Sequence, residues 1–173
     1  QKQTLFNDAT RVPLIFTGPG VIKDNIDLDI PVELVDLYPT IMDLLGFQAP
    51  KFVRGKSLKP YLEGSRLPIK TSALTELKVS MPKGMANGYS IKTTQYRLTQ
   101  WKYIDSLYYE LYDHRYDSNE LNNLADNISY RSVRDSLKQV IRVRIAEAKK
   151  YPSGLGRQID NVLPWKEPKR IRP

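Results

Sequence analysis

Apolar and polar positions alternate along three segments in the middle of the chain, which is the pattern of half-buried strands. These segments are residues 88–92, 95–102 and 108–113, and they are rich in Tyr, Ile, Thr and Trp. Two threonines separate the first segment from the second. With a further strand expected at 72–79, the pattern predicts a four-stranded antiparallel sheet connected as a meander.

Near the C-terminal end, the spacing of apolar positions changes from every second residue to the spacing of a helix. Between residues 130 and 150 apolar positions follow close to helical spacing, and most Arg and Lys residues lie on the other side. This predicts a long amphipathic helix that packs on the sheet. A shorter helix is predicted to begin at Asp36, a good N-cap, with Pro39 in its first turn and Gly46 at its end.

Three other segments complete the expected organisation. The apolar run 11–17, ended by Gly-Pro-Gly, predicts a buried strand that enters a tight turn. Residues 47–70 hold three prolines and two glycines, which predicts a surface connection with one short helical turn at 58–62. Residues 151–173 hold four prolines and two glycines and predict an irregular tail.

The composition excludes several kinds of site. The chain has no Cys and a single His, His114, so thiolate metal sites, a Cys nucleophile and multi-His metal centres are excluded within these residues. No apolar run approaches the roughly 20 residues of a membrane span. The chain starts with Gln1 and has no initiator Met, so we expect it to begin within a longer protein.

The net charge of +8 comes entirely from one part of the chain. Residues 1–130 are neutral, whereas residues 131–173 carry 12 basic and 4 acidic side chains. A basic surface of this kind attracts polyanions. Three readings stay open: a solvated helix face and tail, a contact with an anionic glycan, and a contact with nucleic acid or anionic lipid.

Three separated segments resemble the C-terminal portion of sulfatases, most closely the iduronate-2-sulfatase-like branch. They are Lys2 to Phe16, Gly88 to Trp101, and Glu110 to Ala125, which contains Glu-Leu-Tyr-Asp and Asp-Ser-Asn-Glu-Leu-Asn-Asn-Leu. The three segments occur in the same order as in the family, and three matches in this order are more specific than a match of any single segment. Arg54 to Leu58 also resembles a common sulfatase turn.

The resemblance implies an alkaline-phosphatase-like α/β enzyme of which this chain is the rear part. Residues 1–70 would end the catalytic α/β domain, 71–150 would form a C-terminal α+β subdomain of antiparallel sheet and helix, and 151–173 a basic tail. The family uses a formylglycine nucleophile and a calcium ion, and neither motif is found in this sequence. Both are therefore expected in an upstream portion or chain, and the family's location is secreted, periplasmic or lysosomal.

Lys2 is the one active-site residue that the resemblance carries over. The family's lysine in this segment contacts the sulfate, where an ammonium can neutralise charge as the ester is cleaved. Lys92 and Arg97, on the predicted hairpin, are candidate contacts to an anionic sugar, and ion pairs with Glu76 or Glu110 are the structural alternative. His114 is expected to be exposed or to brace a loop.

Three functions remain in competition. The leading one is a sulfatase acting on sulfated sugars or glycosaminoglycans, without a nucleic-acid partner or a membrane span. The second is a phosphoesterase or phosphonate hydrolase of the same superfold. The third is a non-catalytic module that binds acidic polymers through residues 131–173, for which binding should fall steeply with salt.

Overall fold

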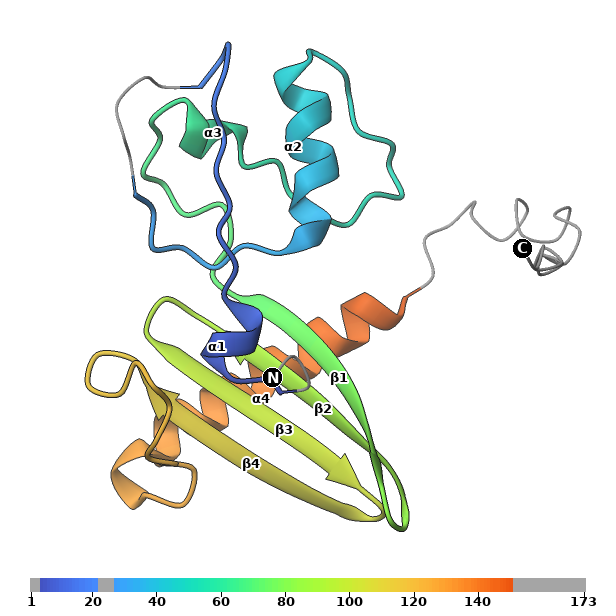
Figure 1. Ribbon diagram of the computed structural model, residues 1–173, viewed down its shortest axis with the longest axis vertical. Coiled ribbons are helices and arrows are strands. Elements are labelled where there is room, and N and C mark those ends of the chain that lie inside the picture. Colours follow the sequence, from blue (N-terminus) through green and yellow to red (C-terminus); the bar gives the residue numbers. More distant parts are fainter. Residues whose placement is uncertain (1–3, 22–26, 151–173) are drawn as a thin grey trace, which may run out of the picture.

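The alternating segments form one antiparallel sheet whose two faces are covered by different parts of the chain (Figure 1). The computed structural model describes residues 4–21 and 27–150. A short helix near the N-terminus lies on one face of the sheet and a long C-terminal helix on the other. Two further helices belong to a lobe beside the sheet, formed by residues 11–70, with its gap at 22–26.

The sheet has the meander connectivity that the sequence predicts. Its strands are β1 (Ala73–Met81), β2 (Gly84–Lys92), β3 (Tyr96–Tyr103) and β4 (Ser106–Asp113). Each pairs with its neighbours in sequence, in the order β1-β2-β3-β4. The strands connect by very short turns, which antiparallel pairing allows. The structure confirms the prediction and extends β1 and β2 toward the turn between them.

The main core lies between the sheet and α4 (Arg131–Lys149), which follows a 3-10 turn at Ile128–Tyr130. Ile91, Leu98 and Leu111 are register neighbours on adjacent strands, and all three are fully buried. Leu137 and Ile141, one helical turn apart, pack against them. Alternation on the strands and the helical period on α4 therefore bury one common set of side chains, as predicted.

The opposite face of the sheet carries α1 (Asn7–Thr10) and the residues just before it. Leu5 is buried there, and the Phe6 ring meets the Tyr112 ring edge to face at 6.0 Å between centroids. Gly88 allows Leu5 to pack this closely on the sheet, since a Cβ on Gly88 would lie 2.5 Å from the Trp101 ring and 2.6 Å from Leu5 Cδ1. The N-terminal segment is thus seated on β2.

Gly88→Ala is expected to lower the free energy of unfolding by about 1–3 kcal/mol, because the added methyl group overpacks this contact. The added methyl group would also push against Leu5, so we expect faster hydrogen exchange at residues 5–10. Urea unfolding of the whole protein measures the first effect. Asn87→Ala, one residue away on the opposite face, is the control and should change stability by no more than about 0.5 kcal/mol. Equal effects of the two substitutions would contradict the packing argument.

The lobe contains α2 (Leu37–Leu44) and α3 (Lys59–Leu62), as the sequence predicts, with a 3-10 turn at Leu34–Asp36 in front of α2. Asp36 precedes α2, but its carboxylate does not cap that helix. It is fully buried and accepts hydrogen bonds from Glu33 N (2.8 Å), Lys56 N (2.9 Å) and Lys70 Nζ (2.6 Å). Asp36 therefore joins three parts of the lobe.

Gly55 explains how the segment before α3 reaches this carboxylate. A Cβ on Gly55 would lie 1.8 Å from the carbonyl oxygen of Val35, so only glycine permits the approach that brings Lys56 N to Asp36. The sequence Arg54 to Leu58, which could be mistaken for a phosphate loop, is thus a packing turn against the start of α2.

Glu33 connects the lobe to the sheet and to α4. Its Oε1 accepts a hydrogen bond from Leu74 N at 2.8 Å, and its Oε2 contacts Lys70 Nζ and Arg144 Nη2, the latter at 2.7 Å. These partners come from the start of β1, the end of the lobe and the C-terminal half of α4. The Glu33 carboxylate therefore connects the lobe to both the sheet and α4.

The prediction of a buried strand at 11–17 is wrong. The structure assigns no strand to these residues, and Val12 and Ile15 are 61% and 84% exposed. A strand needs a neighbour to satisfy its backbone groups, and the described residues provide none here. The apolar run is real, but the surface against which it would be buried is not supplied by the part of the chain that the structure describes.

No helix within residues 4–21 and 27–150 is both long and apolar enough to cross a membrane.

Candidate functional site

A buried row of polar side chains lies under α1, on the face of the sheet turned away from α4. Ser90 and Thr99 face each other across β2 and β3, and Thr99 Oγ1 lies 3.0 Å from Ser90 Oγ. Arg97 stands next to them on β3 and is 2% exposed. Alternation explains the row, because Leu98 points into the core while its neighbours on both sides point away from it.

The Arg97 guanidinium is fully engaged with other protein groups. Its Nε donates to Glu120 Oε1 at 2.5 Å and its Nη1 to Ser90 Oγ at 3.1 Å. Its Nη2 donates to Thr10 Oγ1 at 2.9 Å and to Asn7 Oδ1 at 3.3 Å. The ion-pair partner is therefore Glu120 and not Glu76 or Glu110, and the arginine connects β3 to α1.

Glu120 and His114 complete this cluster. Glu120 Oε1 also contacts His114 Nε2 at 2.7 Å, and Oε2 accepts a hydrogen bond from Asn7 N at 2.7 Å. Burial lowers the pKa of His114, against the opposing effect of Glu120, so the ring is neutral at pH 7 and its Nε2–H donates. His114 thus braces the loop, one of its two expected roles.

Lys92 lies beside Arg97, its register partner on β3. Its ammonium donates to the carbonyl oxygens of Thr93 and, at 3.1 Å, Thr94. Burial and the Arg97 charge lower the pKa of Lys92 to about 8, and Arg11 contributes in the same direction. Both of these acceptors are uncharged carbonyl oxygens. Among the described residues no carboxylate lies within ion-pair distance of the Lys92 ammonium, and the nearby Glu120 is paired with Arg97.

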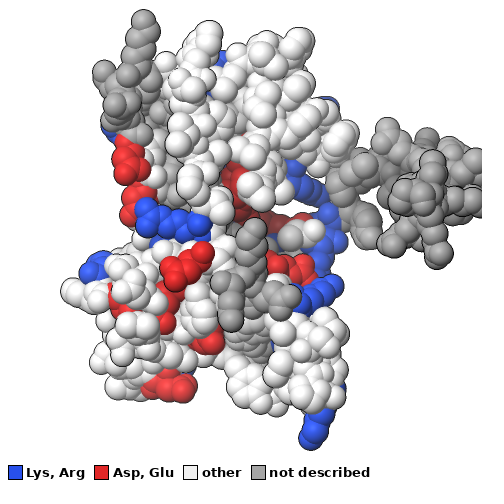
Figure 2. Space-filling model, viewed as in Figure 1, with Lys and Arg blue, Asp and Glu red and all other residues white. Residues whose placement is uncertain are grey.

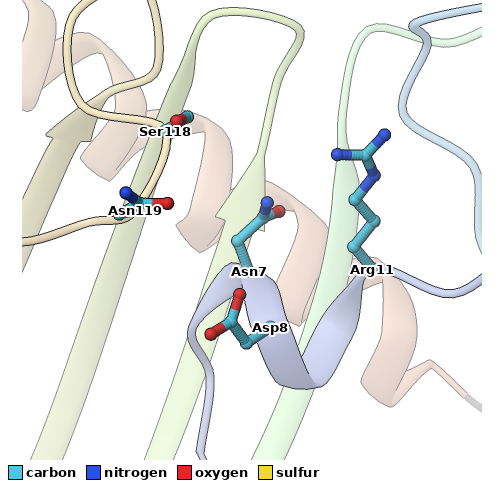
Figure 3. A pocket seen from close by; sticks show the side chains of 5 residues that line it. All are labelled: Asn7, Asp8, Arg11, Ser118 and Asn119. Carbon is cyan, nitrogen blue, oxygen red and sulfur yellow. The ribbon is translucent and has the colours of Figure 1, made fainter.

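A cavity of about 350 Å³ opens next to the cluster (Figure 3). Its walls come from α1 and the residue after it, and from the loop that follows β4. All of the lining side chains are polar or charged: Asn7, Asp8, Arg11, Ser118 and Asn119. Among the described residues, Arg11 forms no ion pair with Asp8, its neighbour in this wall, and Asp36 is paired with Lys70.

The structure brings together two of the three predicted site residues. Lys92 and Arg97 lie side by side on one face, as the hairpin predicts, with Arg97 enclosed and Lys92 half-buried. Lys2 lies outside the described residues. Sequence reasoning missed Glu120 as a buried partner. The available signal was an acidic residue three positions after Asp117 in a turn-rich loop, close to the chain's single histidine.

The described residues do not fit a metal site. Residues 4–21 and 27–150 contain no group of three or more His, Cys, Asp or Glu side chains placed to hold an ion. Glu120 and Asp36, the two fully buried acids with ion-pair partners in different segments, already contact Arg97 and Lys70.

Comparison with known proteins gives consistent matches. The family model described as "N-sulphoglucosamine sulphohydrolase, C-terminal" matches residues 1–147. A protein named sulfatase from Formosa agariphila is 33% identical over 140 residues, which cover 81% of this chain and 25% of that protein. Arylsulfatase K of Danio rerio is 34% identical over 131 residues, covering 72% of this chain and 24% of the relative.

The fold also matches solved structures. A structure described as a 2-O GAG sulfatase superimposes with a TM-score of 0.75 at 26% identity, over 85% of this chain and 32% of that one. The chain thus spans about a quarter of the length of the curated relatives and about a third of the solved one.

Proposed function

The chain belongs to the family of sulfatase C-terminal regions, and from that premise we propose that it is the C-terminal part of an enzyme that hydrolyses sulfate esters. The observation that carries the proposal is the family match over residues 1–147. Because the chain spans about a quarter of its curated relatives, catalysis is assigned to the whole protein and not to these residues alone. Residues 71–150 would be the C-terminal subdomain, and 1–70 the end of the catalytic domain.

The exposed apolar surface of the lobe supports a contact with the rest of such an enzyme. Large hydrophobic side chains are exposed along the lobe, and the lobe surface in view in Figure 2 is mostly uncharged. These side chains are Val12, Leu14, Ile15, Leu34, Val35, Tyr38, Ile41, Leu45, Phe47, Phe52 and Leu67. Exposed apolar surface is typical of sites that contact another protein surface. We assign this surface to the upstream portion of the sulfatase.

The same portion would supply the formylglycine nucleophile and the calcium ion that the family resemblance implies. In this chain, Lys2 would contact the sulfate. Lys92 would add a positive charge for an anionic sugar, with Arg11 near it. Arg97 is enclosed by protein groups, so its contribution would be to hold α1 in place.

A sulfated sugar is the substrate class we propose, with a glycosaminoglycan unit of the iduronate-2-sulfatase-like kind as the specific form. The positive charge of Lys92, on the α1 face of the sheet, suits an anionic sugar. The similarity to a protein described as a 2-O GAG sulfatase supports this choice. Such substrates would place the enzyme in a secreted, periplasmic or lysosomal setting.

Release of sulfate by the whole protein tests the proposal. Purified whole protein is incubated with sulfated disaccharides, their phosphorylated counterparts and an aryl phosphonate ester, and free sulfate and phosphate are measured. We expect turnover of the sulfate ester above that of the phosphorus esters. Preferential phosphonate turnover would replace the proposal with a phosphonate hydrolase. Salt-sensitive glycan binding with no release would favour a binding module.

Lys92 predicts a distinctive pH dependence of substrate affinity. Its pKa is lowered to about 8, so its positive charge is lost as the pH rises through 8 and not through 10.5. If Lys92 contacts an anionic substrate, KM should rise up to about tenfold between pH 7 and 9, since a hydrogen bond to a charged group contributes about 1.5 kcal/mol or more.

Lys92→Arg and Lys92→Gln provide the comparison. Arginine keeps its charge throughout this range, so Lys92→Arg should show no rise in KM near pH 8, and Lys92→Gln should show a raised KM at every pH. Arg97, Arg11, Asp29 and Glu120 also act on this ammonium, and none of them is altered in these two variants. The same pH profile in Lys92→Gln and the parent protein would rule out this contact.

A further inference from the structure

The Glu120 carboxylate is fully buried and joins three segments that are far apart in sequence. Oε1 contacts Arg97 Nε at 2.5 Å and His114 Nε2 at 2.7 Å, and Oε2 accepts from Asn7 N at 2.7 Å. Asn7 and Glu120 are separated by 113 positions. We refer to Glu120, Arg97 and His114 as the carboxylate clamp.

The loop after β4 is shaped to deliver this carboxylate. Glu120 has φ +58°, in the left-handed region that few residues other than glycine adopt. Asp117 stabilises the turn, because its carboxylate accepts hydrogen bonds from Leu121 N at 3.0 Å and Asn122 N at 2.8 Å. An unusual backbone conformation held by its surroundings is typical of functional positions. The loop thus aims Glu120 at α1.

Apolar packing alone would not fix the orientation of α1. None of its four residues is buried, and its nearest apolar contacts are made by Leu5 and Phe6, just before it. Hydrophobic contact is non-directional, whereas hydrogen bonds have defined angles. The clamp supplies the directional contacts: Glu120 at Asn7 N, and Arg97 Nη2 at Asn7 Oδ1 and Thr10 Oγ1. Both ends of α1 are therefore held.

We propose that Glu120 is a positioning residue for catalysis, which fixes α1 through Asn7 N and thereby holds the cavity-lining side chains of Asn7, Asp8 and Arg11 in place. This rests on the proposed sulfatase function. Asn7 and Asp8 lie on α1 and Arg11 directly follows it, so releasing α1 would shift all three side chains. A displacement of 1 Å at a group that contacts the substrate can cost about 100-fold in rate.

The test compares two substitutions at Asn7 in the whole protein. Asn7→Pro removes the N–H that Glu120 accepts and places the proline ring there. The backbone suits proline, because Asn7 is the first residue of α1 and Phe6 before it is extended, with ψ 163°. Asn7→Ala removes only the side chain and is the matched control. Glu120→Gln is the second variant, which keeps the shape of the side chain but loses its charge, with Glu76→Gln on the exposed part of β1 as its control.

Two readouts are taken. The first is hydrogen exchange at residues 5–10, which we expect to be at least about tenfold faster in Asn7→Pro and Glu120→Gln, with α4 unchanged. The second is sulfate release, for which kcat should fall about 10- to 100-fold in these two variants while KM changes less than about threefold. A stabilising role alone would lower the amount of active protein and leave kcat per folded molecule unaltered.

Normal exchange in Asn7→Pro, or kcat equal to that of Asn7→Ala, would overturn the proposal. A rise in KM without a fall in kcat would also overturn it. If the parent protein releases no sulfate, the proposed function fails, and the exchange experiment still decides whether Glu120 positions α1. If Glu120→Gln does not fold, the two Asn7 variants decide the outcome, since they leave the Arg97–Glu120 pair chemically intact.

Discussion

Lys2→Ala in the whole protein is expected to lower kcat for sulfate-ester hydrolysis by about 10²–10³-fold. Removing one preorganised group that stabilises developing charge typically has an effect of this size. The sulfate leaves with more negative charge than it had in the ester, so the loss should fall mainly on kcat. Steady-state release of sulfate from a sulfated disaccharide measures it.

Two further substitutions make this result specific. Lys78→Ala removes a lysine that is largely exposed on β1, and it should leave kcat within a factor of about two, because exposed charges contribute little. Lys2→Arg keeps the charge but changes the geometry of the donors, so an intermediate rate is expected. If Lys2→Ala keeps the full rate, the one catalytic role that the resemblance assigns in this chain is wrong.

Asp36→Ala is expected to lower the free energy of unfolding by about 3–5 kcal/mol, the usual result of breaking a buried ion pair. The substitution leaves Lys70 with Glu33 alone and removes the acceptor for the N–H groups of Glu33 and Lys56. The lobe should loosen first, since these groups are its internal connections. Urea unfolding gives the overall loss, and hydrogen exchange at Lys56 and Leu58 reports the lobe.

Asp43→Ala is the matched control for this experiment. Asp43 lies within α2, which Asp36 precedes, and its carboxylate accepts a hydrogen bond from the Ser57 hydroxyl at 2.6 Å, but its side chain is 45% exposed. We expect a loss of about 1 kcal/mol or less there. An Asp36→Ala variant that unfolds within about 1 kcal/mol of the parent would show that the buried carboxylate is not what holds the lobe together.

The sheet and α4 could be predicted from sequence because their determinants are local. Alternation at Ile91, Leu98 and Leu111 and helical spacing at Leu137 and Ile141 each define a buried face, and short turns leave one simple order for the strands. The same alternation placed Lys92 and Arg97 on a common face. These features need no knowledge of distant partners.

The remaining features depend on partners that local patterns do not reveal. Asp36 has the sequence position of an N-cap, yet its carboxylate bonds to Lys56 and Lys70, 20 and 34 positions away. Glu120 lies in a polar turn that would normally face water, and only folding brings Asn7 to it. Residues 11–17 carry the pattern of a buried strand, but the described residues offer no strand beside them. In all three cases the outcome depends on whether a partner distant in sequence is present.

The separation of Asn7 and Glu120 has a consequence for the order of folding. The hairpins of the sheet close over short loops, whereas the contact at Asn7 closes a span of 113 positions. Such non-local contacts form late, because their loop entropy is opposed until other contacts are in place. During synthesis from the N-terminus, residues 4–10 therefore leave the ribosome before their docking surface exists. Of the residues that the structure describes, those that are synthesised first are therefore expected to dock last.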